Sequence, residues 1–164
     1  MVPGTAASFQ TRLDQVASRT DNSVHIGAPL DTVWSLTNDV RMWPLIFARY
    51  DTVEVLHEEG PTIRFRLKME PDAHGFVWSW VSERTIDEAT HSVRAHHLDA
   101  GPFRFMRVHW TYERDGRGTT LRWRKEFQAR PDGPGDGDIT TNVGLQMEAL
   151  KNRVEVAAGW MGRR

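Results

Sequence analysis

The sequence contains no cysteine, which excludes disulfides, thiolate metal sites and a thiol nucleophile. Its apolar runs extend over only a few residues, too short for a membrane span or for the apolar core of a secretory signal. The formal net charge is -1, without a basic excess that would attract a phosphate backbone. A length of 164 residues suits one compact domain. We therefore expect a cytoplasmic domain with neither nucleic acid nor membrane as a partner.

The signature motifs of several enzyme classes are also missing. The sequence has no GxSxG turn, P-loop or dinucleotide fingerprint. It therefore does not support an enzyme that acts through an acyl-serine or one that binds a nucleotide. Its seven histidines show no HxH or HExxH spacing. His96 and His97 are adjacent in a predicted strand and would point to opposite faces of the sheet. No metal site is expected.

Tryptophan is unusually frequent, with seven Trp against two Tyr. A core is built more easily from Leu and Ile than from flat, bulky indoles. The imbalance indicates that flat surfaces serve a flat ligand.

The N-terminal third is predicted to be largely helical after one strand. Residues 1–18 form an extension that fits either a short helix or a loosely docked tail. A strand follows from Asp21, and Pro29 then marks the start of a helix. A second short helical piece, in "RMWPLIFARY", is interrupted by Pro44.

The central part has a period of two and turn residues between its segments, which predicts an antiparallel meander. The expected strands cover residues 50–58, 61–69, 75–85, 91–98, 103–114 and 118–128.

A long C-terminal helix is predicted after the proline- and glycine-rich "RPDGPGDGD". Its apolar residues at helical spacing are Ile139, Val143, Leu145, Met147, Leu150, Val154 and Ala158. The order of elements predicts an α+β domain over residues 19–164, in which a curved seven-stranded antiparallel sheet wraps the last helix. Such a fold leaves an interior cavity if the inward side chains do not fill it.

The stretch "FVWSWVSER" contains an arginine that continues an aromatic face. Read as a strand, it places Phe76, Trp78, Trp80, Ser82 and Arg84 on one side of the sheet. Arg84 then lies inside the cavity or at its mouth, where it would act as an electrostatic catalyst. The alternative is an arginine at a strand end, paired with an acid and wetted by solvent.

A second strand, "LRWRKEF", repeats this pattern. Leu121, Trp123, Lys125 and Phe127 share a face, so Lys125 interrupts an apolar stripe. The alternative is a lysine that extends past the aromatic side chains to reach water.

Several segments together resemble a known family. "VWSLTNDVRMWPLIFARY", "FRLKMEPDAHGFVWSWVSER", "VRAHHLDAGPFRFMRVHWTYE" and "GTTLRWRKEF" are similar to the single-domain aromatase/cyclases of bacterial type II, or aromatic, polyketide synthases. The nearest patterns are those of the tetracenomycin and spore-pigment cyclases. The likeness runs from Arg19 to Trp160, and residues 1–18 lie outside it.

The resemblance implies the helix-grip fold, also called Bet v 1-like or START-like. It also implies a pocket that folds a linear poly-β-ketone tethered to an acyl carrier protein and directs closure of the first ring. In the nearest relatives that ring joins carbons nine and fourteen. The ketosynthase and chain-length factor are further candidate partners, and no metal or redox cofactor is implied.

The resemblance also implies site residues. The family's catalytic pocket positions match Arg84, Tyr50 and Ser82. Its wall positions match Trp43, Phe47, Trp78, Trp80, Phe103, Met106, Trp110 and Trp123. The chain departs from the family where Lys125 replaces a pocket glutamine and Gln146 stands in place of an asparagine. Because wall polar groups would hold particular ketones, these departures leave ring position and chain length open.

The expected mechanism depends on placement and charge. Closing the ring requires one acidic methylene to lie against one carbonyl, and a guanidinium such as Arg84 stabilises the resulting oxyanions. Tyr50 and Ser82 would donate or relay protons. Two readings without catalysis remain: a carrier of hydrophobic ligands with the same fold, and a chaperone that steers spontaneous cyclisation of the polyketide.

Overall fold

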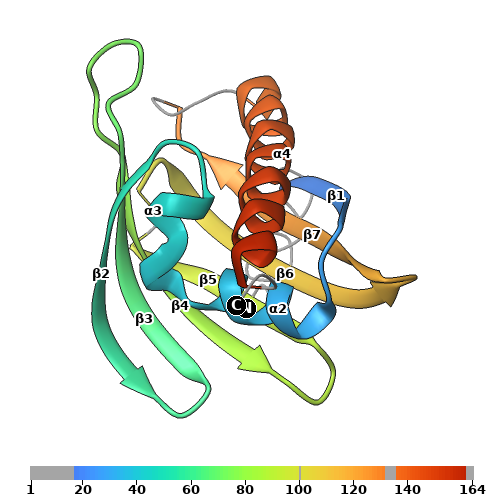
Figure 1. Cartoon of the computed structure of the whole chain (residues 1–164). Helices are drawn as coiled ribbons and strands as arrows, with labels where there is room; N and C mark the ends of the chain where they lie inside the picture. Colours follow the sequence, from blue (N-terminus) through green and yellow to red (C-terminus); the bar gives the residue numbers. More distant parts are fainter. Residues whose placement is uncertain (1–16, 100, 132–135, 162–164) are drawn as a thin grey trace, which may run out of the picture.

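The protein folds as one curved sheet with helices on its concave side (Figure 1). The structure is a computed structural model that describes residues 17–99, 101–131 and 136–161, with the side chains of residues 136–142 and 161 outside the description. Its elements are β1 (Ser18–Ile26), α2 (Leu30–Asn38), η1 (Val40–Met42), α3 (Trp43–Ile46), β2 (Tyr50–Glu59), β3 (Thr62–Met69), β4 (Ser79–Asp87), β5 (Ser92–Asp99), β6 (Phe103–Asp115), β7 (Gly118–Ala129) and α4 (Asp136–Met161).

Within the described ranges, seven antiparallel strands form the sheet in the order β1-β7-β6-β5-β4-β3-β2. Strands β2 to β7 are a meander, because each pairs with the next along the chain. Strand β1 pairs with β7, so α2, η1 and α3 carry the chain from one edge of the sheet to the other. Helix α4, red in Figure 1, lies across the concave face and contacts β1, α2 and α3. The predicted α+β architecture is confirmed.

Helix α4 buries one stripe against the sheet. Val143, Met147, Leu150 and Val154 are all at most 4% exposed, and their spacing of three or four residues places them on one helical face. The prediction that Leu145 belongs to this stripe is wrong, since its side chain is 65% exposed. Two residues are about 200° on a helix, which turns Leu145 away from Val143. The side chain of the predicted Ile139 lies outside the described residues.

Two further expectations for the N-terminal part need correction. Strand β1 starts at Ser18 rather than at Asp21. Pro44 does not interrupt a helix but lies in the first turn of α3. Backbone N–H groups in the first turn have no intrahelical partner, so the N–H that proline lacks costs no hydrogen bond. The predicted helix or tail of the extension falls in residues 1–16, outside the described residues, so the domain boundary near residue 18 stays a prediction.

The predicted strand 75–85 is wrong at its start, because β4 begins at Ser79. The preceding segment is a turn in which the Asp72 carboxylate accepts hydrogen bonds from the backbone N–H groups of His74 and Phe76, both at 2.9 Å. Phe76 is consequently 55% exposed instead of facing the cavity with the later residues. This connection between β3 and β4 extends past the end of the sheet, in green at the upper left of Figure 1.

None of the helices in the described part of the chain is long and apolar enough to cross a membrane.

Candidate active site

A cavity of about 800 Å³ lies between the sheet and helix α4. It forms because α4 and α3 cover the concave face without filling the space above strands β3 to β7. All of the site residues expected from the sequence line it: Arg84, Tyr50, Ser82, Trp43, Phe47, Trp78, Trp80, Phe103, Met106, Trp110, Trp123, Lys125 and Gln146. Their roles in binding and catalysis stay predictions.

Arg84 is a buried cation against indole faces. Its side chain is 1% exposed, and its Cζ lies 4.2 Å from the ring centroid of Trp110 and 5.2 Å from that of Trp43. Its Nη2 donates a 2.6 Å hydrogen bond to Asn38 Oδ1, and no carboxylate of the described residues pairs with it. Burial lowers the pKa of Arg84 to about 10, so the group remains protonated at neutral pH. The alternative of a solvated arginine paired with an acid is excluded.

A neutral hydrogen-bond network orients this cation. Asn38 Nδ2 donates to Trp34 O at 3.0 Å and to the Tyr112 hydroxyl at 3.4 Å, which leaves Asn38 Oδ1 free to accept from Arg84. The Tyr112 hydroxyl also lies 2.7 Å from Thr37 Oγ1. Burial raises the pKa of Tyr112, which therefore stays uncharged. The guanidinium is thus held without being neutralised.

The sequence analysis missed Asn38 and Tyr112. Tyr112 could have been found, because alternation along its strand places it on the same face as Trp110. Asn38 gives no such signal, since it is the last residue of α2 and reaches Arg84 only through the packing of helix on sheet.

Tyr50 and Ser82 face the same cavity as Arg84. Tyr50 is the first residue of β2, and its ring lies 5.0 Å from Phe47 and 6.2 Å from Trp43, centroid to centroid. Burial raises the pKa of Tyr50 to about 12, so its hydroxyl stays protonated at neutral pH. Ser82 is 5% exposed and lies two residues before Arg84 on the same face of β4.

His97 is a further cavity residue that the sequence analysis did not select. It pairs with Ser82 across β4 and β5, and its ring stacks on Trp80 at 5.3 Å. His96 is exposed on the outer face, as the alternation predicted. Strand alternation could have identified His97, because it lies four residues after the buried Val93 and therefore on the same face of β5.

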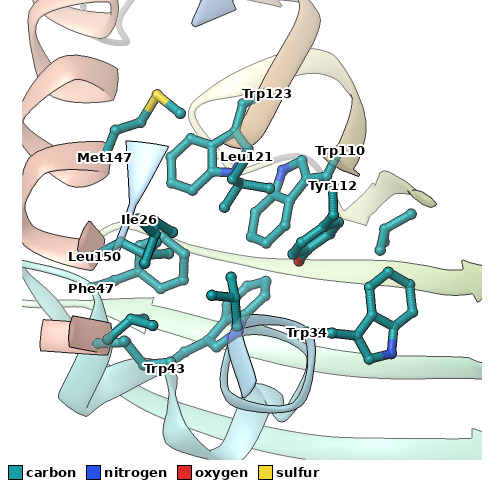
Figure 2. Close-up of a cluster of buried hydrophobic side chains, with 14 of the residues drawn as sticks. Ile26, Trp34, Trp43, Phe47, Trp110, Tyr112, Leu121, Trp123, Met147 and Leu150 are labelled. Carbon is teal, nitrogen blue, oxygen red and sulfur yellow. The ribbon is translucent and has the colours of Figure 1, made fainter. Parts of the chain in front are cut away.

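Stacked aromatic side chains form the wall beneath Arg84. The ring centroids of Trp110 and Trp123 are 4.8 Å apart with planes at 17°, and those of Trp43 and Trp110 are 5.9 Å apart at 20°. Figure 2 shows this cluster, with Met147 and Leu150 projecting from α4 toward the side chains of the sheet. The wall is therefore flat and apolar.

Phe103 and Met106 both line the cavity although an unbroken strand would turn them to opposite faces. A register shift between Phe103 and Phe105 inserts one residue into the pairing of β6 with β7, which reverses the parity.

Lys125 and Gln146, the two departures from the family pattern, differ in how they are held. Lys125 is partly buried with its Nζ 5.6 Å from the Trp123 ring, and burial lowers its pKa to about 8. Gln146 is 5% exposed and donates from Nε2 to Ala48 O at 2.6 Å, which ties α4 to the segment after α3. Gln146 therefore has a structural contact as well as a place in the cavity wall.

Among the described residues, no three His, Asp or Glu side chains converge as a metal site would require.

Comparison with known proteins assigns the family. Residues 26–149 match the family described as polyketide cyclase / dehydrase and lipid transport. The chain belongs to this family. A protein of Streptomyces cyaneus that carries the name polyketide cyclase is 43% identical over 145 residues, covering 85% of this chain and 95% of that protein. The expectation of a polyketide cyclase/dehydratase is thereby confirmed.

Solved structures support the fold of this polyketide cyclase family. The Zhui aromatase/cyclase from Streptomyces sp. R1128 superposes with a TM-score of 0.70 at 24% identity, covering 87% of this chain and 94% of that one. A START superfamily protein from Mycobacterium smegmatis has a TM-score of 0.70 at 16% identity, covering 87% and 98%. The START-like, helix-grip fold expected from the sequence is confirmed.

Proposed function

We propose that this protein is an aromatase/cyclase of type II polyketide biosynthesis that takes a linear poly-β-ketone, tethered to an acyl carrier protein, into its cavity. There it directs aldol closure of the first ring, between carbons nine and fourteen, followed by loss of water and aromatisation. The observation that carries this proposal is the buried, uncompensated guanidinium of Arg84 on a wall of stacked indoles.

The chemistry develops negative charge on oxygen. A methylene between two ketones loses a proton to give an enolate, whose carbon attacks a second carbonyl and leaves an alkoxide. Arg84 stabilises both oxyanions, and more strongly than in water because it is desolvated and already oriented by Asn38. The hydroxyl of Tyr50, protonated at neutral pH, donates the proton that the alkoxide takes up.

Substrate folding is the task of the apolar wall. A poly-β-ketone has several reactive pairs of carbons, so the shape of the cavity decides which pair meets. The indoles of Trp43, Trp110 and Trp123 offer flat faces to a product that becomes flat on aromatisation. They also keep out the water that would permit other cyclisations.

Turnover separates this proposal from a carrier of hydrophobic ligands. The experiment supplies carrier-bound poly-β-ketone from a minimal synthase and adds this protein at one-hundredth of the substrate concentration. An enzyme converts many equivalents to one cyclised product. A yield limited to one equivalent per protein, or tight binding without a change of product, would instead identify a carrier or chaperone.

Replacing Asn38 by Asp is expected to lower the cyclisation rate at least about tenfold while the fold is kept, because a carboxylate beside Arg84 neutralises its charge. Initial rates at neutral pH check this. Asn152→Asp at the exposed surface of α4 is the matched control and leaves the rate unchanged. A wild-type rate in Asn38→Asp would show that the free positive charge is not needed.

Replacing Lys125 by Gln, the amide found in the family pattern, is expected to change the product ratio. An amide both donates and accepts hydrogen bonds, whereas an ammonium only donates and adds charge, so a different ketone is held at this wall. Product profiles from the reconstituted synthase test this. An identical distribution at the same rate would show that Lys125 has no role in positioning.

Binding of the acyl carrier protein is expected to weaken as salt rises. Acyl carrier proteins are strongly acidic, and the exposed Arg49 lies at the lining of the cavity. Titration with labelled carrier protein at low and high ionic strength measures the effect. An affinity that does not change with salt would contradict docking by charge.

A further inference from the structure

The chain has three lysines, and they occupy different environments. Lys68 Nζ lies 3.9 Å from an Asp51 carboxylate oxygen, and Lys151 pairs with Glu155 one turn along α4. Lys125 alone of the three lines the cavity, and no carboxylate of the described residues pairs with its Nζ.

Lys125 is surrounded by apolar groups on its own strand and by one hydroxyl across the sheet. Trp123 and Phe127, each 1% exposed, flank it on the same face of β7. Its partner in β1 is Thr20, whose buried Oγ1 has no hydrogen-bond partner within the described structure. Directly paired residues carry their side chains on the same face, with Cβ atoms about 5 Å apart. Lys125, which lines the cavity, therefore lies beside a buried hydroxyl that has no hydrogen-bond partner among the described residues.

We propose that Lys125 is a covalent site: its amine condenses with a ketone of a β-diketone segment and holds that segment as a Schiff base or its vinylogous amide. The ligand class is a β-dicarbonyl compound. This inference deepens the proposed function and rests on it for its biological substrate, but the covalent chemistry can be tested without a polyketide.

The condensation needs no further reactant. The lone pair of neutral Nζ attacks the ketone carbon, forming a C–N bond and a carbinolamine after proton transfer from nitrogen to oxygen. The C–O bond then breaks, and the oxygen leaves as water with the second amine proton. In a β-diketone the imine takes up the proton of the intervening methylene to give a conjugated vinylogous amide. Hydrolysis reverses each step and releases the chain.

The Thr20 hydroxyl can assist at the oxygen. Located across from Lys125, it is positioned to donate to the carbinolamine oxygen or to accept from it as water leaves. The conjugated adduct would fix one carbonyl of the chain relative to Arg84, and so select the carbons that meet.

The apolar surroundings favour the neutral amine that this chemistry requires. At pH 7 a pKa of about 8 leaves roughly a tenth of the amine unprotonated, against fewer than about one in a thousand for an ordinary lysine. The other charged or titratable groups of the described cavity lining are Arg49, Tyr50, Asp72, His74, Arg84 and His97. Two of these are arginines, and the single carboxylate belongs to the turn that precedes β4.

The test is labelling of the full-length protein with acetylacetone, a small β-diketone. Adduct formation is followed by the near-ultraviolet absorption of the vinylogous amide, and its site by peptide mass mapping, at the mass of the diketone less one water. Labelling at Lys125 is expected to be at least about tenfold faster than at Lys68 or Lys151 at pH 7, and to accelerate as pH rises toward 8.

Variants assign the site. Lys68→Arg and Lys151→Arg are expected to keep the fast adduct, while Lys125→Arg and Lys125→Met lose it, with circular dichroism confirming that each is folded. Thr20→Val is expected to slow the reaction without moving its site. Equal labelling of the three lysines, or an unchanged fast adduct in folded Lys125→Arg, would overturn the proposal.

The cyclisation assay tests the proposed function and the labelling experiment tests the covalent site, so either proposal can be contradicted without the other. A fast Lys125 adduct in a protein without cyclase activity would contradict the proposed function alone. Full cyclase activity with no preference for Lys125 would contradict the covalent site alone.

Discussion

Replacing Arg84 by Ala is expected to lower directed cyclisation at least about 100-fold, because the variant loses a buried cation of the cavity to which the proposed mechanism assigns stabilisation of the oxyanions. The fold is expected to survive, with a loss of about 1–3 kcal/mol of stability from leaving Asn38 Oδ1 unpaired. Initial rates and product profiles from the reconstituted synthase measure the effect, and circular dichroism reports on the fold. Unchanged cyclised product from folded Arg84→Ala would remove this residue from the mechanism.

Two further variants sharpen that experiment. Arg84→Lys is expected to recover only part of the activity, since an ammonium keeps the charge but loses the planar fork that bonds Asn38 and lies on the Trp110 ring. Arg64→Ala is the matched control. Arg64 lies on the neighbouring strand β3 but pairs with Glu83 at the exposed surface, so its loss should leave the rate and the product unchanged.

Replacing Leu150 by Ala is expected to destabilise the protein by about 2–5 kcal/mol, because it removes a fully buried side chain from the contact between α4 and the cavity wall. This is a large share of the roughly 5–15 kcal/mol that holds a typical domain folded. Chemical denaturation followed by circular dichroism gives the change in the free energy of unfolding.

The same helix offers a matched control for this prediction. Leu145 is also a leucine of α4 but is 65% exposed, so Leu145→Ala should change the free energy of unfolding by no more than about 0.5 kcal/mol. Equal losses in the two variants would show that α4 is not docked by the stripe that contains Leu150.

Strand alternation was the most informative signal in the sequence. It placed Trp80, Ser82 and Arg84 on one face, and the structure buries all three beside the cavity. It also placed Lys125 with Trp123, and both line the cavity. These assignments succeeded because successive side chains of β4 and β7 alternate between the two faces of the sheet without interruption over these residues.

The failures have local physical causes. Phe76 was assigned to the inner face, but the Asp72 carboxylate bonds the backbone of the segment and delays the strand to Ser79. The shared orientation of Phe103 and Met106 depends on a register shift that no periodicity reveals. The contact of Asn38 with Arg84 joins residues 46 positions apart, so it follows only from packing.

The most direct test of the account is the ring connectivity of the product that a minimal synthase releases with and without this protein. Feeding isotopically labelled acetate and reading carbon–carbon couplings by NMR identifies the first bond closed. The account predicts one product with the bond between carbons nine and fourteen when the protein is present, and a mixture of cyclisations when it is absent. The same mixture in both reactions would contradict it.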